Sequence, residues 1–470
     1  MTHERRLKLW HLVESYAPDY GGGAAVTTRE VCRLLAERGH EVRVLCVENA
    51  PGPDYAVRTD FDGPIRIDRV NLPYFKTEDP EGWRLGLRRW REHERRIDAL
   101  LGTLLDDWRP DVVDYHTVRP LGEQCLFTLA RRGVPVLATL HDAWLICPRV
   151  MLLRSPDAQA CSGPSPARCL TCLYSQYDGK VRACIKLPWR LLKLGVYPAY
   201  RLRRRTQARG FVAAALARSE FMAAMHRPHL PGRVRHIPLG VDLTGLPTER
   251  PERPRRIPRF GFVAGFQPSK GIEDVLAAAA ALKQNGLSFE LHVWGPEQGR
   301  GAAAVAALGL QDRVILRGMF GPEQRWEVYA EIDVALMATT VCEPLGRVPL
   351  EAGAAGVPTI GPAVGGIVES IRHNVDGLLY RFRDAADLEW QMRRVLTETD
   401  LVPRLIGNLP APVDVRDRVG EVEALYLSLL GRWPLADPRV RRPLPLLAAV
   451  GLPGEAFMGR GRVVHKEGVT

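Results

Sequence analysis

Glu343 and Glu351 are two carboxylates eight residues apart, one in a loop after an apolar strand and one a turn into the helix that follows. Backbone N–H groups at the start of such a helix point outward and can bind an anion. The residues at this helix start are Leu345, Gly346, Arg347 and Val348. The Glu351 carboxylate can accept hydrogen bonds from two vicinal hydroxyls. The spacing favours a ligand with phosphates and sugar hydroxyls, such as a nucleotide sugar; the alternative is that both glutamates only add charge near a helix N-terminus.

Five of the nine cysteines gather between residues 147 and 184. Cys169 and Cys172 form a C-x2-C pair, and Cys147 and Cys161 lie upstream on a loop rich in Gly, Pro and Ser. In a cytosolic chain, four thiolates favour a structural zinc ion over disulfides. We therefore expect one zinc ion on these four residues, with Cys184 left over or in place of Cys147. The alternative is a set of buried or unliganded thiols.

The segment 180–209 carries ten basic residues and no acidic one, in a chain whose net charge is +11. Apolar residues alternate with the basic ones, so the segment is expected to be amphipathic. Such a segment suits an anionic membrane surface or a phosphate-bearing substrate. The alternative is a solvated helix whose Arg and Lys side chains cover a buried apolar face. We expect no nucleic acid partner, because no recognised nucleic-acid-binding module accompanies the charge.

The composition is that of an ordinary globular protein, with 46% hydrophobic and 25% charged residues in 470. No run of about 18 apolar residues is present, which argues against a membrane-spanning helix. The polar N-terminus is followed by an apolar run too short for a secretory signal. We therefore expect a cytoplasmic protein, or one held at the inner face of the membrane.

The elements that position these residues form two alternating series of strands and helices, which predicts an α/β fold with two doubly wound domains. In the first series a glycine-rich loop joins a strand at Leu7–Val13 to a helix at Val26–Arg38. The other strands expected in it are Glu41–Val47, Val112–Tyr115, Val134–Leu140 and Val212–Ala217. The second series has strands expected at Phe260–Val263, Phe289–Trp294, Val314–Arg317, Val334–Met337, Val357–Ile360 and Gly377–Tyr380. Its helices are expected at Ile272–Gln284, Glu323–Ala330, Val348–Ala355 and Ile367–Arg372.

Composition places the boundaries of these domains. Residues 1–235 form the expected N-terminal domain, with the cysteine-rich loop 147–184 inside it, and the proline-rich segment 236–258 is the expected linker. Residues 259–395 form the second domain. C-terminal helices are expected over 396–430, and the Pro-, Arg- and Gly-rich residues 431–470 are expected to be a tail. Because ligands of such folds bind at the carboxyl ends of the strands, the two domains are expected to face across a cleft.

The chain resembles the retaining GT-B glycosyltransferases of family 4 over about residues 7–430, because several motifs occur in order. The block Glu343–Ile371 is similar to the family's E-x7-E segment with its Gly-Val-Pro strand and Gly-Gly loop. The segment His236–Asp242 resembles the family's I-P-N-G-V-D, with Leu in place of Asn. The other matches are Gly21–Gly23, Gly39–Val42, Ser219 and Lys270–Gly271. The resemblance implies two Rossmann-like domains, the N-terminal one on the acceptor side and the second one binding the nucleotide sugar.

The resemblance also implies roles for individual residues. Glu343 would hold the donor sugar, Glu351 the ribose and Lys270 the leaving diphosphate. Gly22 and Gly23 would contact phosphates from the N-terminal domain.

Two further positions follow from the same resemblance. His141 ends a strongly apolar strand where the family has a histidine that touches the transferred sugar; the alternative is a structural hydrogen-bonding histidine. His116 is a weaker candidate after the preceding strand. Where the family usually has an arginine, five residues before the lysine, this chain has Gly265, so Lys270 would carry the positive charge alone.

The activity implied by the resemblance is transfer of a sugar from a nucleoside diphosphate donor, with retention at the anomeric carbon, to a glycan, lipid-linked or small-molecule acceptor. No cofactor would be required, because lysine and helix dipoles can neutralise the leaving group. Two alternatives are a catalytically weak scaffold protein of the same shape and a nucleotide-sugar epimerase.

Overall fold

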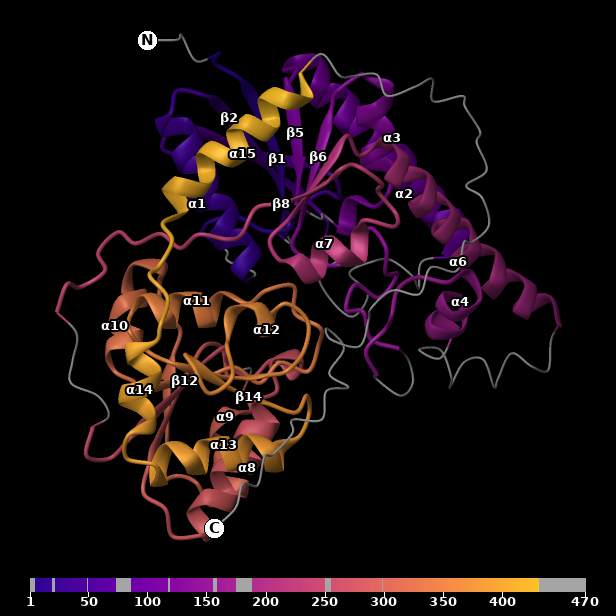
Figure 1. Ribbon diagram of the computed structural model, residues 1–470. Helices are drawn as coiled ribbons and strands as arrows, with labels where there is room; N and C mark the ends of the chain where they lie inside the picture. The colour runs from indigo at the N-terminus through magenta and orange to yellow at the C-terminus, as the bar shows by residue number, and fades with distance from the viewer. Residues whose placement is uncertain are drawn as a thin grey trace. The chain divides into compact units, whose positions relative to one another are not determined.

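The computed structural model describes residues 5–18, 22–48, 50–72, 86–116, 119–154, 159–174, 188–249, 255–297 and 299–430. Residues up to Asp242, together with 414–430, form one compact unit, and Leu243–Val413 form a second (Figure 1). Both units have a twisted sheet covered by helices, as the sequence predicts. No helix in the described part of the chain is both long and apolar enough to cross a bilayer.

The first unit is built on an eight-stranded sheet in the order β3-β4-β2-β1-β5-β6-β7-β8. All neighbouring strands are parallel except the hairpin β3–β4. The strands are β1 Lys8–Leu12, β2 Glu41–Glu48, β3 Val57–Asp62, β4 Ile65–Asn71, β5 Val112–Tyr115, β6 Val136–Leu140, β7 Ala214–Ala217 and β8 Val234–His236. The helices are α1 Gly23–Glu37, α2 Gly86–Asp107, α3 Gln124–Arg131, α4 Pro166–Tyr174, α6 Pro188–Ala208, α7 Glu220–His226 and α15 Val415–Leu429. The strand order reverses between β1 and β5, where loops at the carboxyl ends of the strands diverge and ligands of such sheets bind.

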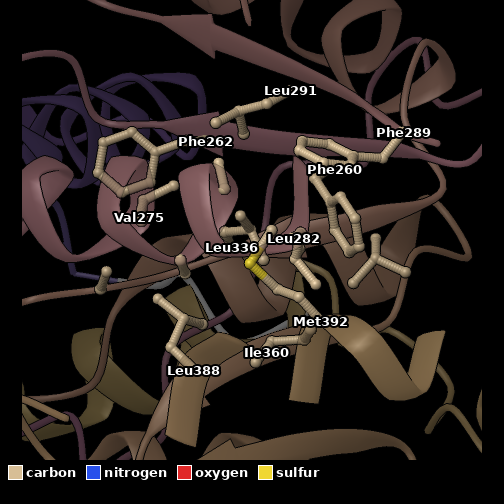
Figure 2. Packing of buried hydrophobic residues seen from close by; sticks show 14 of the residues in the cluster. Phe260, Phe262, Val275, Leu282, Phe289, Leu291, Leu336, Ile360, Leu388 and Met392 are labelled. Atoms are coloured by element: carbon tan, nitrogen blue, oxygen red, sulfur yellow. The ribbon is translucent and has the colours of Figure 1, made fainter. Parts of the chain in front are cut away.

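The second unit is built on a six-stranded parallel sheet in the order β11-β10-β9-β12-β13-β14. The strands are β9 Arg259–Val263, β10 Glu290–Trp294, β11 Val314–Gly318, β12 Val334–Leu336, β13 Thr359–Pro362 and β14 Gly377–Tyr380. The helices are α8 Ile272–Gln284, α9 Gly301–Ala307, α10 Arg325–Ala330, α11 Arg347–Ala354, α12 Ile367–Ser370, α13 Ala385–Thr397 and α14 Leu401–Gly407. Figure 2 shows its apolar interior, where Phe260 and Phe262 of β9 lie among Leu282 of α8 and Met392 of α13. Here the strand order reverses between β9 and β12.

The last described helix, α15, belongs to the first unit although it follows the second in sequence. It lies beside α1 (Figure 1), and its Glu423 accepts hydrogen bonds from His40, at 2.9 Å, and from Arg38, at 2.7 Å. The Tyr426 hydroxyl donates to Asp114 Oδ2 at 2.6 Å. The region expected as C-terminal helices, 396–430, therefore divides, with α14 in the second unit and α15 in the first.

Most predicted strands and helices are present within a few residues of their expected bounds, and α8 and β14 have the expected bounds. The hairpin β3–β4 has no counterpart among the predicted elements. Strand β3 is mostly exposed and carries charged residues at alternate positions, and the Asp62-Gly63 pair that follows it is a hairpin signal that the prediction did not use. Strand β8 and helix α9 are too short to give a periodic signal.

Candidate active site

Lys270 and Glu343, predicted from separate motifs, form an ion pair in the second unit, with 2.7 Å between Nζ and Oε1. Lys270 ends a short 3-10 turn, Pro268–Lys270, before α8, and Glu343 lies in the loop between β12 and α11. The Lys270 side chain is 36% exposed and that of Glu343 is 15% exposed. Thr339 Oγ1 lies 3.4 Å from the same carboxylate oxygen. The two loops thus meet at the reversal point of the second sheet, with a cation that solvent can reach.

The Gly-Gly loop holds the Glu343 loop in place by close backbone contact. The Gly366 N–H donates to the Glu343 carbonyl at 2.9 Å. A Cβ at Gly365 would lie 2.4 Å from that carbonyl oxygen, and one at Gly366 would lie 1.9 Å from the Pro344 oxygen. Only glycine allows this approach, since real Cβ atoms essentially never come closer than 3.0 Å. The loop therefore fixes the backbone of Glu343 at the start of α11.

Glu351 lies on α11 among cationic and hydroxyl groups. Arg347 donates to Oε1 from Nε at 3.0 Å and from a terminal nitrogen at 2.8 Å. The Tyr329 hydroxyl donates to Oε2 at 3.0 Å, and Arg325 lies 3.7 Å from Oε1. Burial, and then the nearby carboxylate, raise the pKa of Tyr329, so the phenol stays a donor. The sequence did not point to Tyr329 or Arg325, because nothing in α10 shows that it packs beside α11.

The other predicted residues at this place open helix α11. Gly346 is its N-cap, Arg347 is its first residue and Val348 is half-buried, while Leu345 is buried. The first N–H groups of such a helix have no partner within the helix. Helix α11 has eight residues, so its dipole favours an anion at this end.

Gly265, which stands where the family usually has an arginine, occupies a position that accepts no side chain readily. Its φ is 65°, a left-handed conformation, and its N–H donates to the Trp294 carbonyl at 2.8 Å. A Cβ there would lie 2.7 Å from the backbone N and O of Pro296. The local backbone is therefore built around glycine, and an arginine at this position would meet the Pro296 backbone.

The remaining predicted ligand residues belong to the first unit. Gly22 is the N-cap of α1 and Gly23 is its first residue, whereas Gly21 lies outside the described residues. His141 follows β6 and is half-buried, and its Nε2 lies 2.9 Å from Nδ1 of His116. The structure brings His141 and His116 together, which the strand order explains because β5 and β6 are neighbours.

Behind His116 lies a buried cluster that sequence patterns alone do not indicate. His11 Nδ1 is 3.0 Å from His116 Nε2, and Asp114 accepts from Thr139 at 2.7 Å as well as from α15. Burial lowers the pKa of His11 and of His116 to about 3, and burial raises the pKa of Asp114. The only available signal was that β1 and β5 are adjacent strands with a polar residue at matching positions, His11 opposite Asp114.

The four cysteines predicted to bind zinc share one loop region, where Cys161 and Cys169 lie close enough to Cys147 to contribute to the rise of its pKa. In the part of the chain that the structure describes, the only three potential ligand groups within 4.8 Å of one another are His11, Asp114 and His116. The thiols contact backbone groups, and Cys172 also contacts the Arg149 side chain; they are Cys147, Cys161, Cys169 and Cys172. Burial raises the pKa of Cys147 to about 12 and raises that of Cys169. Zinc binding by these thiols stays a prediction, and Cys184 lies outside the described residues.

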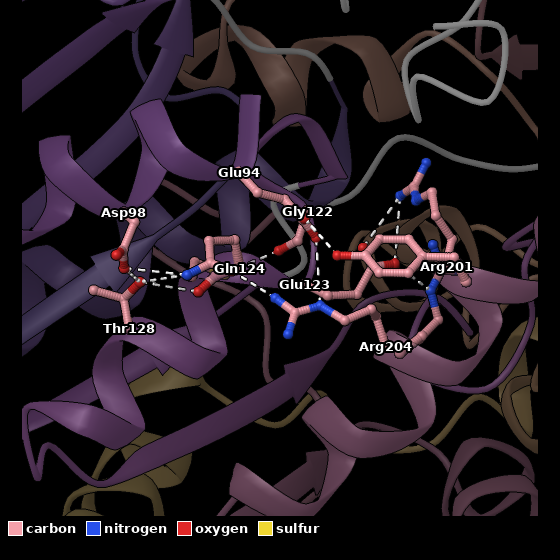
Figure 3. A network of polar contacts seen from close by, with 11 residues as sticks. Glu94, Asp98, Gly122, Glu123, Gln124, Thr128, Arg201 and Arg204 are labelled. Carbon is pink, nitrogen blue, oxygen red and sulfur yellow. Dashed lines mark hydrogen bonds and ion pairs between the residues drawn. The ribbon is translucent and has the colours of Figure 1, made fainter. Parts of the chain in front are cut away.

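Part of the basic segment 180–209 is turned into the protein. Figure 3 shows Arg201 and Arg204 of α6 in a polar network with Glu123, Glu94 and Gln124. Arg201 and Arg205 are 0% and 2% exposed and lie 3.3 Å and 3.1 Å from the Glu123 carboxylate. Although burial alone would raise it, these arginines hold the pKa of Glu123 below its usual value. Arg201 and Arg205 thus serve the interior and do not supply a surface charge. Residues 180–187 lie outside the described part, and membrane contact of the segment 180–209 stays a prediction.

Comparison with known families gives two matches that follow one another along the chain. The model of glycosyltransferase family 4 matches residues 21–244, and that of glycosyl transferases group 1 matches residues 249–409. The second range contains the Lys270–Glu343 pair and Glu351. With the fold of both units, these matches show that the chain belongs to the GT-B glycosyltransferases of group 1.

Similar proteins agree with that assignment. D-inositol 3-phosphate glycosyltransferase of Geodermatophilus obscurus is 32% identical over 37% of this chain and 42% of its own length. 2-Deoxystreptamine N-acetyl-D-glucosaminyltransferase of Streptomyces fradiae is 27% identical over 84% of this chain and 89% of its own. The chain spans about two fifths of the length of several curated relatives that it matches. These relatives are transferases, so they do not favour the scaffold or epimerase alternatives.

Solved structures share the fold. Sucrose-phosphate synthase of Thermosynechococcus elongatus superposes with a TM-score of 0.62 at 20% identity, over 90% of this chain and 98% of that one. The Anabaena protein HepE in complex with UDP-glucose superposes with a TM-score of 0.58 at 16% identity, over 90% of this chain and all of that one. At such low identity these neighbours show the architecture of two Rossmann-like domains and nothing finer.

Proposed function

We propose that the chain is a retaining glycosyltransferase that moves a sugar from a nucleoside diphosphate sugar to a glycan, lipid-linked or small-molecule acceptor. The observation that carries the proposal is the ion pair of Lys270 and Glu343 at the start of α11, one turn from Glu351. A cation, outward N–H groups and two carboxylates suit a diphosphate flanked by hydroxyl-bearing rings. The complex of HepE with UDP-glucose supports this ligand class.

Each group in this place has a distinct task in the proposed reaction. Lys270 and the N-terminal amides of α11 bind the diphosphate and stabilise the charge that grows on it as the glycosidic bond breaks. Glu351 binds the ribose hydroxyls, and Glu343 binds the transferred sugar. The leaving phosphate accepts the proton of the acceptor hydroxyl, so that attack takes place on the face from which the diphosphate departs. We propose that no metal ion is required, because lysine and the helix dipole neutralise the leaving group.

The class of acceptor is proposed from the names of two relatives and not from contacts in the structure. The names of the relatives from Geodermatophilus and Streptomyces contain inositol phosphate and deoxystreptamine, both small polyhydroxylated rings. These names favour the small-molecule arm of the proposal. A lipid-linked acceptor at the inner face of the membrane, reached through the basic segment 180–209, remains the alternative.

Donor binding is tested by thermal shift and calorimetry of the full chain with UDP-, GDP-, ADP- and dTDP-sugars. A donor that binds the folded protein raises the melting temperature, and the rise grows with the logarithm of the donor concentration divided by its Kd. The accepted donor is then incubated with inositol phosphates, aminocyclitols and lipid-linked acceptors, and NMR of the product determines the anomeric configuration. No binding of any nucleoside diphosphate sugar, or inversion at the anomeric carbon, would contradict the proposal.

Variants on α11 and α10 locate the site. Glu351→Gln should weaken donor binding about tenfold or more, because the ribose hydroxyls lose a charged acceptor, and a hydrogen bond to a charged group is worth about 1.5–3 kcal/mol. Glu327→Gln, on the exposed side of α10, is the matched control and should bind the donor like the wild type. Lys270→Ala should lower kcat strongly and leave the melting temperature nearly unchanged. Equal activity in Lys270→Ala and the wild type would remove the diphosphate role.

A further inference from the structure

Three histidines lie in a row at the carboxyl ends of β1, β5 and β6. His11 Nδ1 lies 3.0 Å from His116 Nε2, and His116 Nδ1 lies 2.9 Å from His141 Nε2. The neighbouring rings are stacked, with centroids 5.2 Å apart in both pairs. Both contacts have hydrogen-bond length, so each nitrogen pair shares one proton. The row leads from the interior of the first unit to the residue predicted to touch the transferred sugar.

The two inner histidines are neutral, which limits each to a single N–H. His11 is 0% exposed and His116 is 4% exposed. Burial lowers the pKa of both rings to about 3, and Arg218 adds to the effect at His116. A neutral imidazole has one donor nitrogen and one acceptor nitrogen. The tautomer of one ring in the row therefore determines the tautomers of the other two.

Thr28 locates the proton of His116. Its hydroxyl has one hydrogen, and it donates that hydrogen to the Ala24 carbonyl at 2.8 Å. Thr28 Oγ1 is also 3.3 Å from His116 Nδ1, and toward that nitrogen it can only accept. His116 Nδ1 therefore carries the proton and donates to His141 Nε2. Because His141 Nε2 then accepts, the proton of the His141 ring lies on Nδ1.

The opposite assignment, with protons on every Nε2, leaves a defect in the interior. His11 Nε2 is buried and has no hydrogen-bond partner. In the opposite assignment it would be a buried, unpaired N–H, whereas in the first assignment it is only an unpaired acceptor. Asp114 does not reverse this preference. Its distance of 3.5 Å from His116 Nε2 exceeds ordinary hydrogen-bond length, and its oxygens accept from Thr139 and Tyr426.

We propose that His116 is a positioning residue that fixes His141 as the tautomer protonated on Nδ1, so that His141 meets a bound sugar as a hydrogen-bond donor rather than as a base acting through Nε2. The part that concerns the sugar rests on the proposed function. The tautomer itself is a property of the protein without ligand. His11, held by β1, completes the row by donating from Nδ1 to His116 Nε2.

A metal ion among His11, Asp114 and His116 is the competing interpretation of the same cluster, since their ligand atoms lie within 4.8 Å of one another. It would need the lone pair of His11 Nδ1, which moves the proton of that ring to the unpartnered Nε2. Arg218, which is 6% exposed, already lies close enough to Asp114 to lower its pKa against the effect of burial. The carboxylate therefore has a counter-charge without an ion, and the hydrogen-bonded row is the better account.

The tautomers are measured by long-range 1H–15N correlation NMR on the full chain with 15N-labelled histidine, with His141→Gln used to assign the His141 signal. We expect His141 with a protonated Nδ1 and an unprotonated Nε2 at pH 7, and the same pattern for His116. A proton on Nε2 of His141 overturns the proposal. Metal analysis is the second readout: one equivalent present in the wild type and lost from folded His11→Gln also overturns it.

Variants separate positioning from folding. His116→Leu removes the Nδ1–H, whereas His116→Asn keeps an amide N–H near the same position. With an accepted donor, we expect kcat to fall about tenfold or more in His116→Leu with an unchanged donor KM, and to recover in His116→Asn. His226→Leu is the control, because His226 is equally buried in the same unit but bonds only the Met222 carbonyl among the contacts described. It should lower stability and leave the His141 tautomer and kcat unchanged.

The two proposals fail separately. If no donor is turned over but His141 is protonated on Nδ1, the proposed function fails and the tautomer stands. If transfer is measured and His116→Leu keeps the wild-type kcat, the function stands and the positioning role of His116 is overturned.

Discussion

The two units of this chain have interiors of different kinds. The second unit has a continuous apolar cluster formed by one face of its sheet with α8 and α13. The first unit also has an apolar cluster, but it buries more ionisable side chains beside it. Those that the structure describes as buried include Arg69, Arg201, Arg205, Arg218, His11, His93, His116 and His226. An apolar interior follows from a pattern along the sequence, whereas a polar one depends on partners that the sequence places far apart.

The pairs in the first unit illustrate the point. Glu123 and Arg201 are 78 residues apart, and Asp114 and Tyr426 are 312 residues apart. Neither pair is visible in any local pattern. Each buried ionisable group is tolerated only while its partner is present, because an uncompensated buried charge is strongly destabilising. The first unit should therefore be the more sensitive of the two to changes in charge.

Acidification should produce the largest difference between the units. Burial holds the pKa of His11 and His116 at about 3 and of His93 and His226 at about 4, below the usual 6.5. Below pH 6.5 the unfolded chain binds protons that the folded one excludes, so the free energy of unfolding falls as the pH falls. Between pH 6 and pH 5 each histidine should contribute about 1 kcal/mol, roughly 4–5 kcal/mol together.

Urea denaturation at pH 7, 6 and 5, with pulsed hydrogen exchange to follow each unit, measures this effect. Protection should be lost first in β5 and β6, and later in β9 and β12. Equal loss in both units would show that the polar interior does not set the acid response.

Removing one buried charge should have the next largest effect. Glu123→Gln keeps the shape of the side chain but leaves Arg201 and Arg205 without a counter-charge, which should destabilise the first unit by about 3–5 kcal/mol. Asp312→Asn in the second unit is the control. Its carboxylate is 55% exposed beside Lys283, so the change should cost far less than Glu123→Gln. Tryptophan fluorescence during urea unfolding measures both, and similar losses would remove the distinction.

In the second unit, Gly265 is sensitive to substitution, because a side chain would not fit there. Gly265→Ala should destabilise this unit by about 1–3 kcal/mol, because a left-handed φ and a close approach to Pro296 both oppose a side chain. Gly286→Ala separates the two causes, since Gly286 has φ 73° but no atom within 4 Å of its Cβ position. The loss should be smaller there. A Gly265→Ala protein as stable as Gly286→Ala would show that Pro296 moves aside.

The smallest effect on stability is expected from the cysteine loop of the first unit. If Cys147, Cys161, Cys169 and Cys172 bind zinc as the sequence predicts, the metal supplies ordering free energy to a loop with few apolar residues. Elemental analysis of protein purified without added metal should find about one equivalent, and chelation should loosen the loop while β1 and β5 stay protected. Less than about a tenth of an equivalent, with four freely titrating thiols, would contradict the prediction.

What the sequence predicts well is the framework of each unit and the position of Glu343 and Glu351. Both follow from local signals. The framework follows from apolar runs bounded by glycine and proline, and the two glutamates follow from one carboxylate before the start of a helix and one a turn after it. The partner of Glu343 is not a local signal, since Lys270 lies 73 residues earlier. Lys270 and Glu343 each match a motif of the family, which predicts that each belongs to the site. The motifs do not predict that the two side chains are in contact.

The basic segment 180–209 shows the limit of composition. Arginine is mostly a surface residue, and a charge run is usually solvated. In this chain Arg201 stacks 3.6 Å above the Trp90 ring and Arg205 lies over Trp144, while both pair with Glu123. The apolar residues between them matched an amphipathic surface helix equally well. Only the positions of Trp90 and Glu123, set by α2 and the segment before α3, decide which way these side chains turn.

The return of α15 to the first unit has a consequence for synthesis of the chain. The ribosome finishes β8 of the first unit and then makes about 170 residues of the second before α15 is available, a delay of roughly 10 to 30 s at ordinary elongation rates. During that time the Asp114 carboxylate lacks the Tyr426 hydroxyl that later donates to it, and His40 lacks Glu423. The second unit can complete its apolar interior in the meantime. The half of the chain that is made first is thus the half that finishes folding last.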